Sequence, residues 1–250
     1  MSSATTPSTL HGTNPGNLPA TTIRPFLLRR LHSLTGIIFG GYLVVHLLVN
    51  ATLVQGVHPH DVFGRQVDKI HSLPFLTVIE WTFIYLPILY HTIYGVFLVI
   101  RPDYNAGHYP YAKNWFYVLQ RASAVYIVFF MLFHVLALKY HVFGDNLGFD
   151  PTSATLTIQR HMAYSKFITW IVYPLGILAS CYHLANGFWT AAITWGLTVS
   201  KGAQRRFGYA CGALFALTFV LGMTALIASV VLAAKVNPDI VPGNTTSAPR

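Results

Sequence analysis

Residues 31–55 read LHSLTGIIFGGYLVVHLLVNATLVQ. This stretch is mostly apolar, carries no acidic or basic residue other than histidine, and as a helix is long enough to cross the roughly 30 Å hydrocarbon layer of a membrane. The apolar run is continuous and lacks the alternation that a membrane-spanning β-strand requires. We therefore expect residues 31–55 to form a transmembrane helix.

Four more runs of this kind follow, at 75–100, 117–141, 164–195 and 208–235. Of the 250 residues, 54% are hydrophobic and 9% are charged, whereas about a quarter of the residues of a soluble domain are charged. Two cysteines in so long a chain do not make a disulfide scaffold. The sequence thus predicts an all-α integral membrane protein with five transmembrane helices.

The two ends of the chain differ in composition from this core. Residues 1–22 are rich in Ser, Thr, Pro and Gly and contain no apolar stretch, so we expect a disordered cytoplasmic tail and no secretory signal peptide. Residues 236–250 are expected to form a second loose tail. The predicted membrane domain therefore comprises residues 23–235.

The basic residues predict the orientation of the chain. The net charge of +9 does not indicate nucleic-acid binding, because the bases flank the apolar runs, where they anchor loops against anionic lipid. With the N-terminus in the cytoplasm, the inner side holds Arg24, Arg29, Arg30, Arg101, Lys113, Arg121, Lys201, Arg205 and Arg206. The outer side holds Arg65, Lys69, Lys139, Arg160, Lys166, Lys235 and Arg250. Because the inner clusters abut the helix ends, we expect the N-terminus inside and the C-terminus outside.

Each of the first four runs carries a histidine well inside it, and the fifth run carries none. At a rise of 1.5 Å per residue, His46 and His134 lie about 22 and 25 Å from the inner side. His91 and His183, on the helices that run inward, lie about 15 and 18 Å from it. The histidines therefore sort into an outer pair, His46 with His134, and an inner pair, His91 with His183.

Two imidazole pairs at matched depths on four helices predict two bis-histidine metal sites, stacked across the membrane. Haem b suits such sites best, because its iron takes two axial imidazoles from facing helices and its flat ring fills the interior of a bundle. Zinc would need further ligands, and Cys181, two residues before His183, points away from that face of a helix. Glycines at 36, 40 and 41 offer a flat helix surface to a planar group. The alternative is that each histidine only bonds a neighbouring helix, which explains one histidine more easily than four at matched depths.

Two electron carriers at different depths form a path for electrons across the bilayer. Such a path needs a donor at one end and an acceptor at the other. Because the chain has no soluble domain, we expect another subunit at one end and a small lipid-soluble carrier, such as a quinone, at the other.

The sequence resembles a known family over residues 24–210. The matching segments, in order, are RRLHSL (29–34), HSLPF (71–75), LPILYHTIYG (86–95), NW to QR (114–121), HLANGFW (183–189) and TWG (194–196). They resemble the two-haem cytochrome b membrane anchor of bacterial succinate:quinone oxidoreductases, the type in which one five-helix chain forms the whole anchor. The resemblance is specific, because several motifs match at similar spacing.

The resemblance implies haem ligands at His46, His91, His134 and His183, with the first four helices forming a bundle around two haems b. It also implies that His32 and Ser33 hold the propionates of the inner haem, where they could donate hydrogen bonds near the membrane surface. A flavoprotein with FAD and an iron–sulfur subunit would dock on the cytoplasmic face and oxidise succinate there. Electrons would then pass from the inner to the outer haem and reduce menaquinone or another quinone.

The protons for quinone reduction need titratable groups near the outer haem. We expect these among Asp68, His71 and Glu80, close to the outer start of the second helix. The alternative is that Asp68 is a solvated loop charge and Glu80 an interfacial residue. Related fumarate reductases carry a glutamate two residues before the fourth histidine, which they use to carry protons across. Here that position is Cys181, which favours succinate oxidation over fumarate reduction.

Three other functions stay open at this stage. The chain could be the anchor of a quinol:fumarate reductase, or of another haem-linked oxidoreductase such as a hydrogenase. A transporter would carry ionisable residues along an ion path inside the helices, and only Glu80, near a helix end, approaches this. A retinal protein would need a lysine in the middle of a helix, and the sequence has none there.

Overall fold

The computed structural model describes residues 20–56, 61–100 and 112–236. Of the two predicted tails, residues 1–19 and 237–250 lie outside the described residues. Residues 20–22 form the first turn of helix α1 (Ala20–Ala51), and residue 236 ends helix α8 (Lys201–Val236).

Five helical stretches of the described residues are long and apolar enough to cross a membrane. They are Pro25–Gln55, Leu76–Ile100, Asn114–Leu138, Ile168–Thr194 and Lys201–Leu232. The first and last belong to α1 and α8. The others contain α3 (Leu76–Glu80) with α4 (Leu86–Ile100), α5 (Ala112–Leu138) and α7 (Tyr173–Thr194). The predicted class, an all-α membrane protein with five transmembrane helices, is confirmed.

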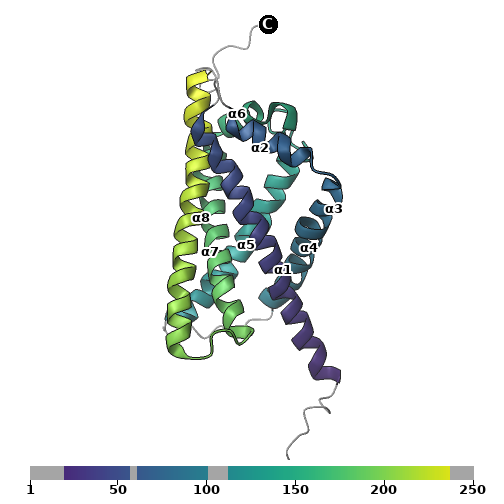
Figure 1. Cartoon of the computed structure of the whole chain (residues 1–250), viewed down its shortest axis with the longest axis vertical. Coiled ribbons are helices and arrows are strands. Elements are labelled where there is room, and N and C mark those ends of the chain that lie inside the picture. Colours follow the sequence, from purple (N-terminus) through teal and green to yellow (C-terminus); the bar gives the residue numbers. More distant parts are fainter. Residues whose placement is uncertain (1–19, 57–60, 101–111, 237–250) are drawn as a thin grey trace, which may run out of the picture.

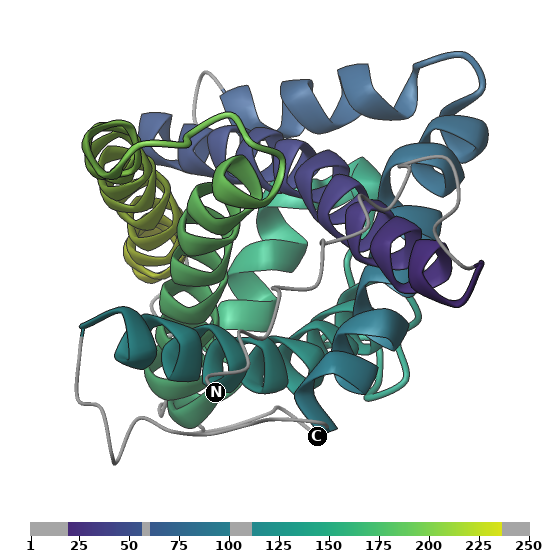
Figure 2. The same cartoon turned by 90° about the horizontal axis from the view of Figure 1, so that it is seen from below.

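The four histidine-bearing helices form a closed ring. Helix α1 packs against α4, α4 against α5, α5 against α7, and α7 against α1. Helix α8 lies outside this ring and packs against α1 and α7, which Figure 2 shows in a view along the bundle. The interior of the bundle is thus lined by the four helices that carry His46, His91, His134 and His183.

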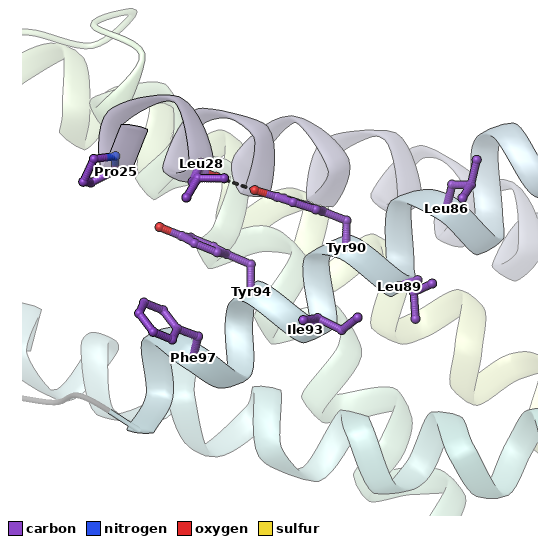
Figure 3. A pocket seen from close by; sticks show the side chains of 8 residues that line it. All are labelled: Pro25, Leu28, Leu86, Leu89, Tyr90, Ile93, Tyr94 and Phe97. Carbon is purple, nitrogen blue, oxygen red and sulfur yellow. Dashed lines mark hydrogen bonds between the residues drawn. The ribbon is translucent and has the colours of Figure 1, made fainter. Parts of the chain in front are cut away.

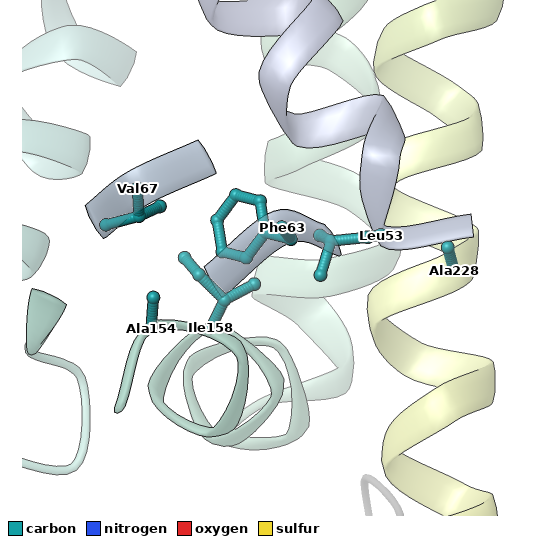
Figure 4. Packing of buried hydrophobic residues seen from close by; sticks show 6 residues of the cluster. All are labelled: Leu53, Phe63, Val67, Ala154, Ile158 and Ala228. Carbon is teal, nitrogen blue, oxygen red and sulfur yellow. The ribbon is translucent and has the colours of Figure 1, made fainter. Parts of the chain in front are cut away.

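Two short helices, α2 (Val62–His71) and α6 (Ala154–Ala163), cross the end of the bundle opposite the start of α1 (Figure 1). Their apolar faces share one buried cluster with the end of α1 and with α8 (Figure 4). Asp61 begins α2 by accepting a hydrogen bond from the Gly64 N–H at 2.9 Å. The same carboxylate accepts the Thr155 hydroxyl at 2.8 Å, which ties α2 to α6.

A π-helical turn precedes the proline inside the second and the fourth membrane-spanning stretches. The turns are Trp81–Tyr85, before Pro87, and Ile168–Val172, before Pro174. Proline has no N–H to donate, and its ring crowds the carbonyl four residues earlier. The wider turn relieves that crowding, so both helices continue through the proline instead of ending there.

Charge divides the described residues between the two ends. All their acids, namely Asp61, Asp68, Glu80, Asp145 and Asp150, lie at the end covered by α2 and α6. The end where α1 begins carries only bases among the described side chains, namely Arg29, Arg30, Arg121, Lys201, Arg205 and Arg206.

Candidate functional site

Two pairs of imidazole rings meet inside the ring of helices. His91 of α4 faces His183 of α7 with ring centroids 6.1 Å apart and planes at 88°. His46 of α1 faces His134 of α5 with centroids 6.0 Å apart and planes at 87°. The structure therefore brings together the same pairs that depth along the helices predicts, each across the bundle.

The spacing within each pair fits a metal between the rings. Imidazole nitrogens bind first-row metals at about 2 Å and the ring centre lies about 1 Å further, so two axial imidazoles have centroids about 6 Å apart. Within the described residues, no three His, Cys, Asp or Glu side chains gather as a metal site. Each candidate site thus offers two imidazoles, the donor set of a six-coordinate haem.

The second nitrogen of three rings meets an oxygen atom. His91 Nδ1 lies 2.9 Å from the His32 carbonyl, and His183 Nδ1 lies 3.2 Å from the Gln120 carbonyl. His134 Nδ1 lies 3.2 Å from the Tyr173 hydroxyl. The two carbonyl groups only accept, so they fix the tautomers of His91 and His183 with N–H at Nδ1 and leave the Nε2 lone pair for a metal, as is usual for histidine ligands. The Tyr173 hydroxyl can either donate to His134 or accept from it.

His46 differs from the other three rings. Its Nε2 lies 3.5 Å from the Asn50 amide nitrogen, which donates a shorter bond of 2.8 Å to the His46 carbonyl. The longer contact is at the limit of a hydrogen bond. Asn50 is therefore held by the backbone of α1, and the His46 ring stays available for a ligand.

The inner pair depends on a glycine. A Cβ atom added at Gly36 would lie 2.5 Å from Cε1 and 2.8 Å from Nδ1 of His91. Alanine there would displace the ring, so Gly36 lets α1 and α4 approach closely enough for His91 to reach the His32 carbonyl. A Cβ atom added at Gly41 would meet no other atom within 4 Å. Only part of the predicted glycine surface therefore serves the close approach of helices.

The two residues expected to hold propionates lie beside the inner pair. The His32 ring stacks on His91 with centroids 4.0 Å apart and planes at 10°. Its Nδ1 is buried and has no hydrogen-bond partner among the described residues, so an acceptor supplied by a bound group would satisfy it. The Ser33 hydroxyl accepts a bond of 3.1 Å from the Trp195 indole and keeps its own proton free to donate.

Arginines stand near the same end of the bundle. Arg121 lies over the Tyr117 ring at 3.5 Å, and its buried Nε has no described hydrogen-bond partner. Arg30 lies over the rings of Phe26 and Trp195 at 4.9 and 5.0 Å. These cations give the inner end of the bundle a positive character that suits carboxylate groups.

The three candidate proton donors are not brought together. Glu80 forms an ion pair with Lys139, whose ammonium lies 3.1 Å from a carboxylate oxygen and 5.0 Å from the Tyr85 ring centroid. Asp68 and His71 are exposed on α2, whose buried face carries Phe63 and Val67. Glu80 alone of the three lies within a membrane-spanning stretch.

Sequence reasoning missed two residues at the outer pair. Tyr173, 5% exposed, contacts His134, and fully buried His161 of α6 lies 2.7 Å from the Tyr173 hydroxyl. The only available signal was the surplus of histidines, 12 against 7 acids. Cys181 is fully buried and contacts Thr218 of α8, so its thiol points away from the ring interior, as its helical position predicts.

An apolar groove of about 630 Å³ lies between the start of α1 and α4 (Figure 3). The Tyr90 hydroxyl spans it at 3.2 Å to the Leu28 carbonyl. Its other lining is mainly aliphatic and aromatic, with exposed Leu86, Leu89 and Ile93. In a membrane such a surface meets lipid chains, and it is separate from the paired histidines.

Membrane-spanning helices that enclose two facing imidazole pairs define a multi-pass membrane protein of the cytochrome b class. The chain is 34% identical over 209 residues to the succinate dehydrogenase cytochrome b558 subunit of Bacillus subtilis (strain 168). This match covers 83% of the chain and 98% of the relative, while no protein-family model matches. The chain therefore belongs to the family of succinate dehydrogenase cytochrome b558 subunits.

Proposed function

We propose that this chain is the two-haem membrane anchor of a succinate:quinone oxidoreductase. The observation that carries the proposal is that two pairs of imidazole rings face each other at two levels of one bundle. Within each pair the ring planes are nearly perpendicular, and the ring centroids are 6.0 and 6.1 Å apart. The similar protein of Bacillus subtilis is a succinate dehydrogenase cytochrome b558 subunit, which supports haem b as the bound group.

The four histidines would hold the haems, with His91 and His183 at the inner site and His46 and His134 at the outer. When bound, the haems would supply one-electron transfer between the two ends of the membrane. His32 and Ser33 would donate hydrogen bonds to the inner propionates. The orphan Nδ1 of His32 and the neighbouring arginine cations support that role.

The basic end of the bundle would face the cytoplasm. Its described side chains include bases and no acids, which is typical of the inner side of a membrane protein. A flavoprotein with FAD and an iron–sulfur subunit would dock there, beside the inner histidine pair. The C-terminus would then lie outside.

The quinone, in our proposal menaquinone, would bind at the opposite end. Glu80 is the best supported proton donor, because its carboxylate lies at the outer end beside Lys139 and Tyr85. Asp68 and His71, exposed on α2, would exchange protons with water near this site.

A reduced-minus-oxidised absorption spectrum of the purified complex tests the proposal. We expect two b-type components with separate midpoint potentials. His91→Ala should remove the inner component and spare the outer, and His46→Ala should do the reverse. A wild-type complex without haem absorbance would refute the anchor, and loss of both components in each variant would refute the pairing. Comparing succinate oxidation with fumarate reduction by the same complex separates an oxidase from a fumarate reductase anchor.

A further inference from the structure

A hydrogen-bonded chain leads from the outer histidine pair to the backbone of the outer surface. His134 Nδ1 of α5 lies 3.2 Å from the Tyr173 hydroxyl of α7, which lies 2.7 Å from Nε2 of His161 in α6. His161 Nδ1 lies 2.7 Å from the carbonyl of Leu147, in the segment that precedes α6. Because the two middle members are buried, water does not compete for these bonds.

The Leu147 carbonyl fixes the direction of every bond in this chain. A carbonyl only accepts, so His161 Nδ1 must carry a proton. Burial lowers the pKa of His161, and its backbone bond to Leu147 opposes that shift only in part, so the ring is neutral and its Nε2 accepts. The Tyr173 hydroxyl therefore donates to His161, and its oxygen accepts the Nδ1 proton of His134.

The consequence reaches the inside of the bundle. With its proton at Nδ1, the His134 ring presents the lone pair of Nε2 toward His46. If the Tyr173 hydroxyl donated to His134 instead, the proton would sit on Nε2 and block a metal. The Leu147 carbonyl thus sets, through His161 and Tyr173, the His134 tautomer that a haem ligand needs.

We propose that Tyr173 and His161 are positioning residues for the outer haem, which fix the tautomer and ring orientation of His134 and raise the basicity of its imidazole. This inference rests on the proposed function. Its basis is the contrast between the two sites. His91 and His183 each bond a backbone carbonyl directly, although the Ser123 hydroxyl also lies 3.3 Å from His183 Nδ1. His134 meets no carbonyl and depends on two side chains. Substitution of either side chain should therefore affect the outer haem alone.

The test is a redox titration of the assembled complex that carries Tyr173→Phe. Removing the acceptor makes the His134 imidazole less basic, so the ferric state loses stabilisation and the outer midpoint rises. Loss of one such bond should shift the reduction equilibrium about three- to tenfold, and tenfold corresponds to about 59 mV for one electron. The inner midpoint should stay unchanged, and the low-spin ferric EPR signal of the outer haem should move.

Tyr126→Phe is the matched control. Its hydroxyl also joins α5 to α7, by a bond of 3.0 Å to the Val172 carbonyl, without contact to a histidine. We expect that variant to leave both midpoints at wild-type values. The comparison separates loss of a tyrosine hydroxyl in general from loss of the bond to His134.

A second pair of variants decides the matter if Tyr173→Phe does not assemble. His161→Leu removes the acceptor of the Tyr173 proton and should raise the outer midpoint. His161→Gln can donate to Leu147 and accept from Tyr173, so it should restore the wild-type value. The inference is overturned if the outer midpoint of the assembled variants matches that of Tyr126→Phe, or if both haems shift alike. A wild-type complex without two b-type haems would instead refute the proposed function.

Discussion

Gly36→Ala should damage the inner haem site while leaving the outer site intact. The added methyl group would lie 2.5 Å from Cε1 and 2.8 Å from Nδ1 of His91, where ordinary van der Waals contact begins at 3.4 Å. Backbone holds the methyl group, so the His91 ring must move by about 1 Å or α1 and α4 must separate. Either movement weakens the 2.9 Å bond from His91 Nδ1 to the His32 carbonyl.

The magnitude follows from three contributions to the free energy of unfolding. Overpacking costs about 1–3 kcal/mol, and loss of the hydrogen bond costs about 1 kcal/mol. Replacing a helical glycine by alanine returns about 0.5–1 kcal/mol. The net cost is about 1–3 kcal/mol, and it falls on the ring that would ligate the inner haem. Loss of the hydrogen-bond partner that orients a metal-ligating histidine typically costs about 10- to 100-fold in metal affinity.

The assay is the haem content and redox titration of the purified complex. The inner component should be lost or shifted, and the outer should keep its content and midpoint. Gly41→Ala is the matched control, because it makes the same change on the same helix with no atom within 4 Å. If the inner haem of Gly36→Ala matches that of Gly41→Ala in content and midpoint, the steric reasoning is wrong.

Three further outcomes test the outer end of the bundle. Asp61→Ala removes the cap of α2 and the Thr155 bond, so thermal unfolding should show a loss of about 2–3 kcal/mol; Thr155→Val should lose less, and an equal loss would contradict the capping role. Glu80→Gln should change the stability by less than about 1 kcal/mol, because the pair with Lys139 is partly exposed, yet slow quinone reduction; an unchanged rate would exclude Glu80 as the proton donor. Burial lowers the pKa of His161 from its ordinary 6.5, so below that pH the unfolded chain binds more protons than the folded one. The free energy of unfolding should therefore fall below pH 6.5, by at most about 1.4 kcal/mol per pH unit. His161→Gln should flatten this slope in thermal unfolding between pH 5 and 8.

The sequence predicted the spans because continuous apolar runs leave helices as the only open structure that satisfies the backbone in lipid. It did not predict α2 and α6, whose short apolar faces have meaning only after the bundle gives them a surface. The contact of Tyr173 with the outer histidine pair could not be predicted from the sequence for a similar reason. Its partner His161 belongs to α6, which is not one of the candidate membrane spans. The two rings meet only because the chain turns between α6 and α7.

The depth of a residue along a helix is predicted more reliably from the sequence than the neighbours of its helix face. Gly95 follows His91 by four residues and so lies on the same face of α4, yet a Cβ there would meet the His32 ring at 3.2 Å. The space beside Gly95 is thus occupied by the His32 side chain of α1. Spacing alone gave the shared face on α4, and the packing of α1 decided what occupies it.

The π turns explain why depth is the safer quantity. One extra residue in a helix advances the chain by only about 1.5 Å but rotates everything beyond it by about 100°. The turns at Trp81–Tyr85 and Ile168–Val172 lie on the outer side of His91 and His183 in their helices. The Trp81–Tyr85 turn lies between Glu80 and His91, so it changes the face of the helix on which Glu80 stands relative to His91 while scarcely changing its level. Levels of histidines therefore survive such irregularities, whereas the side chains that surround each histidine must be read from the folded chain.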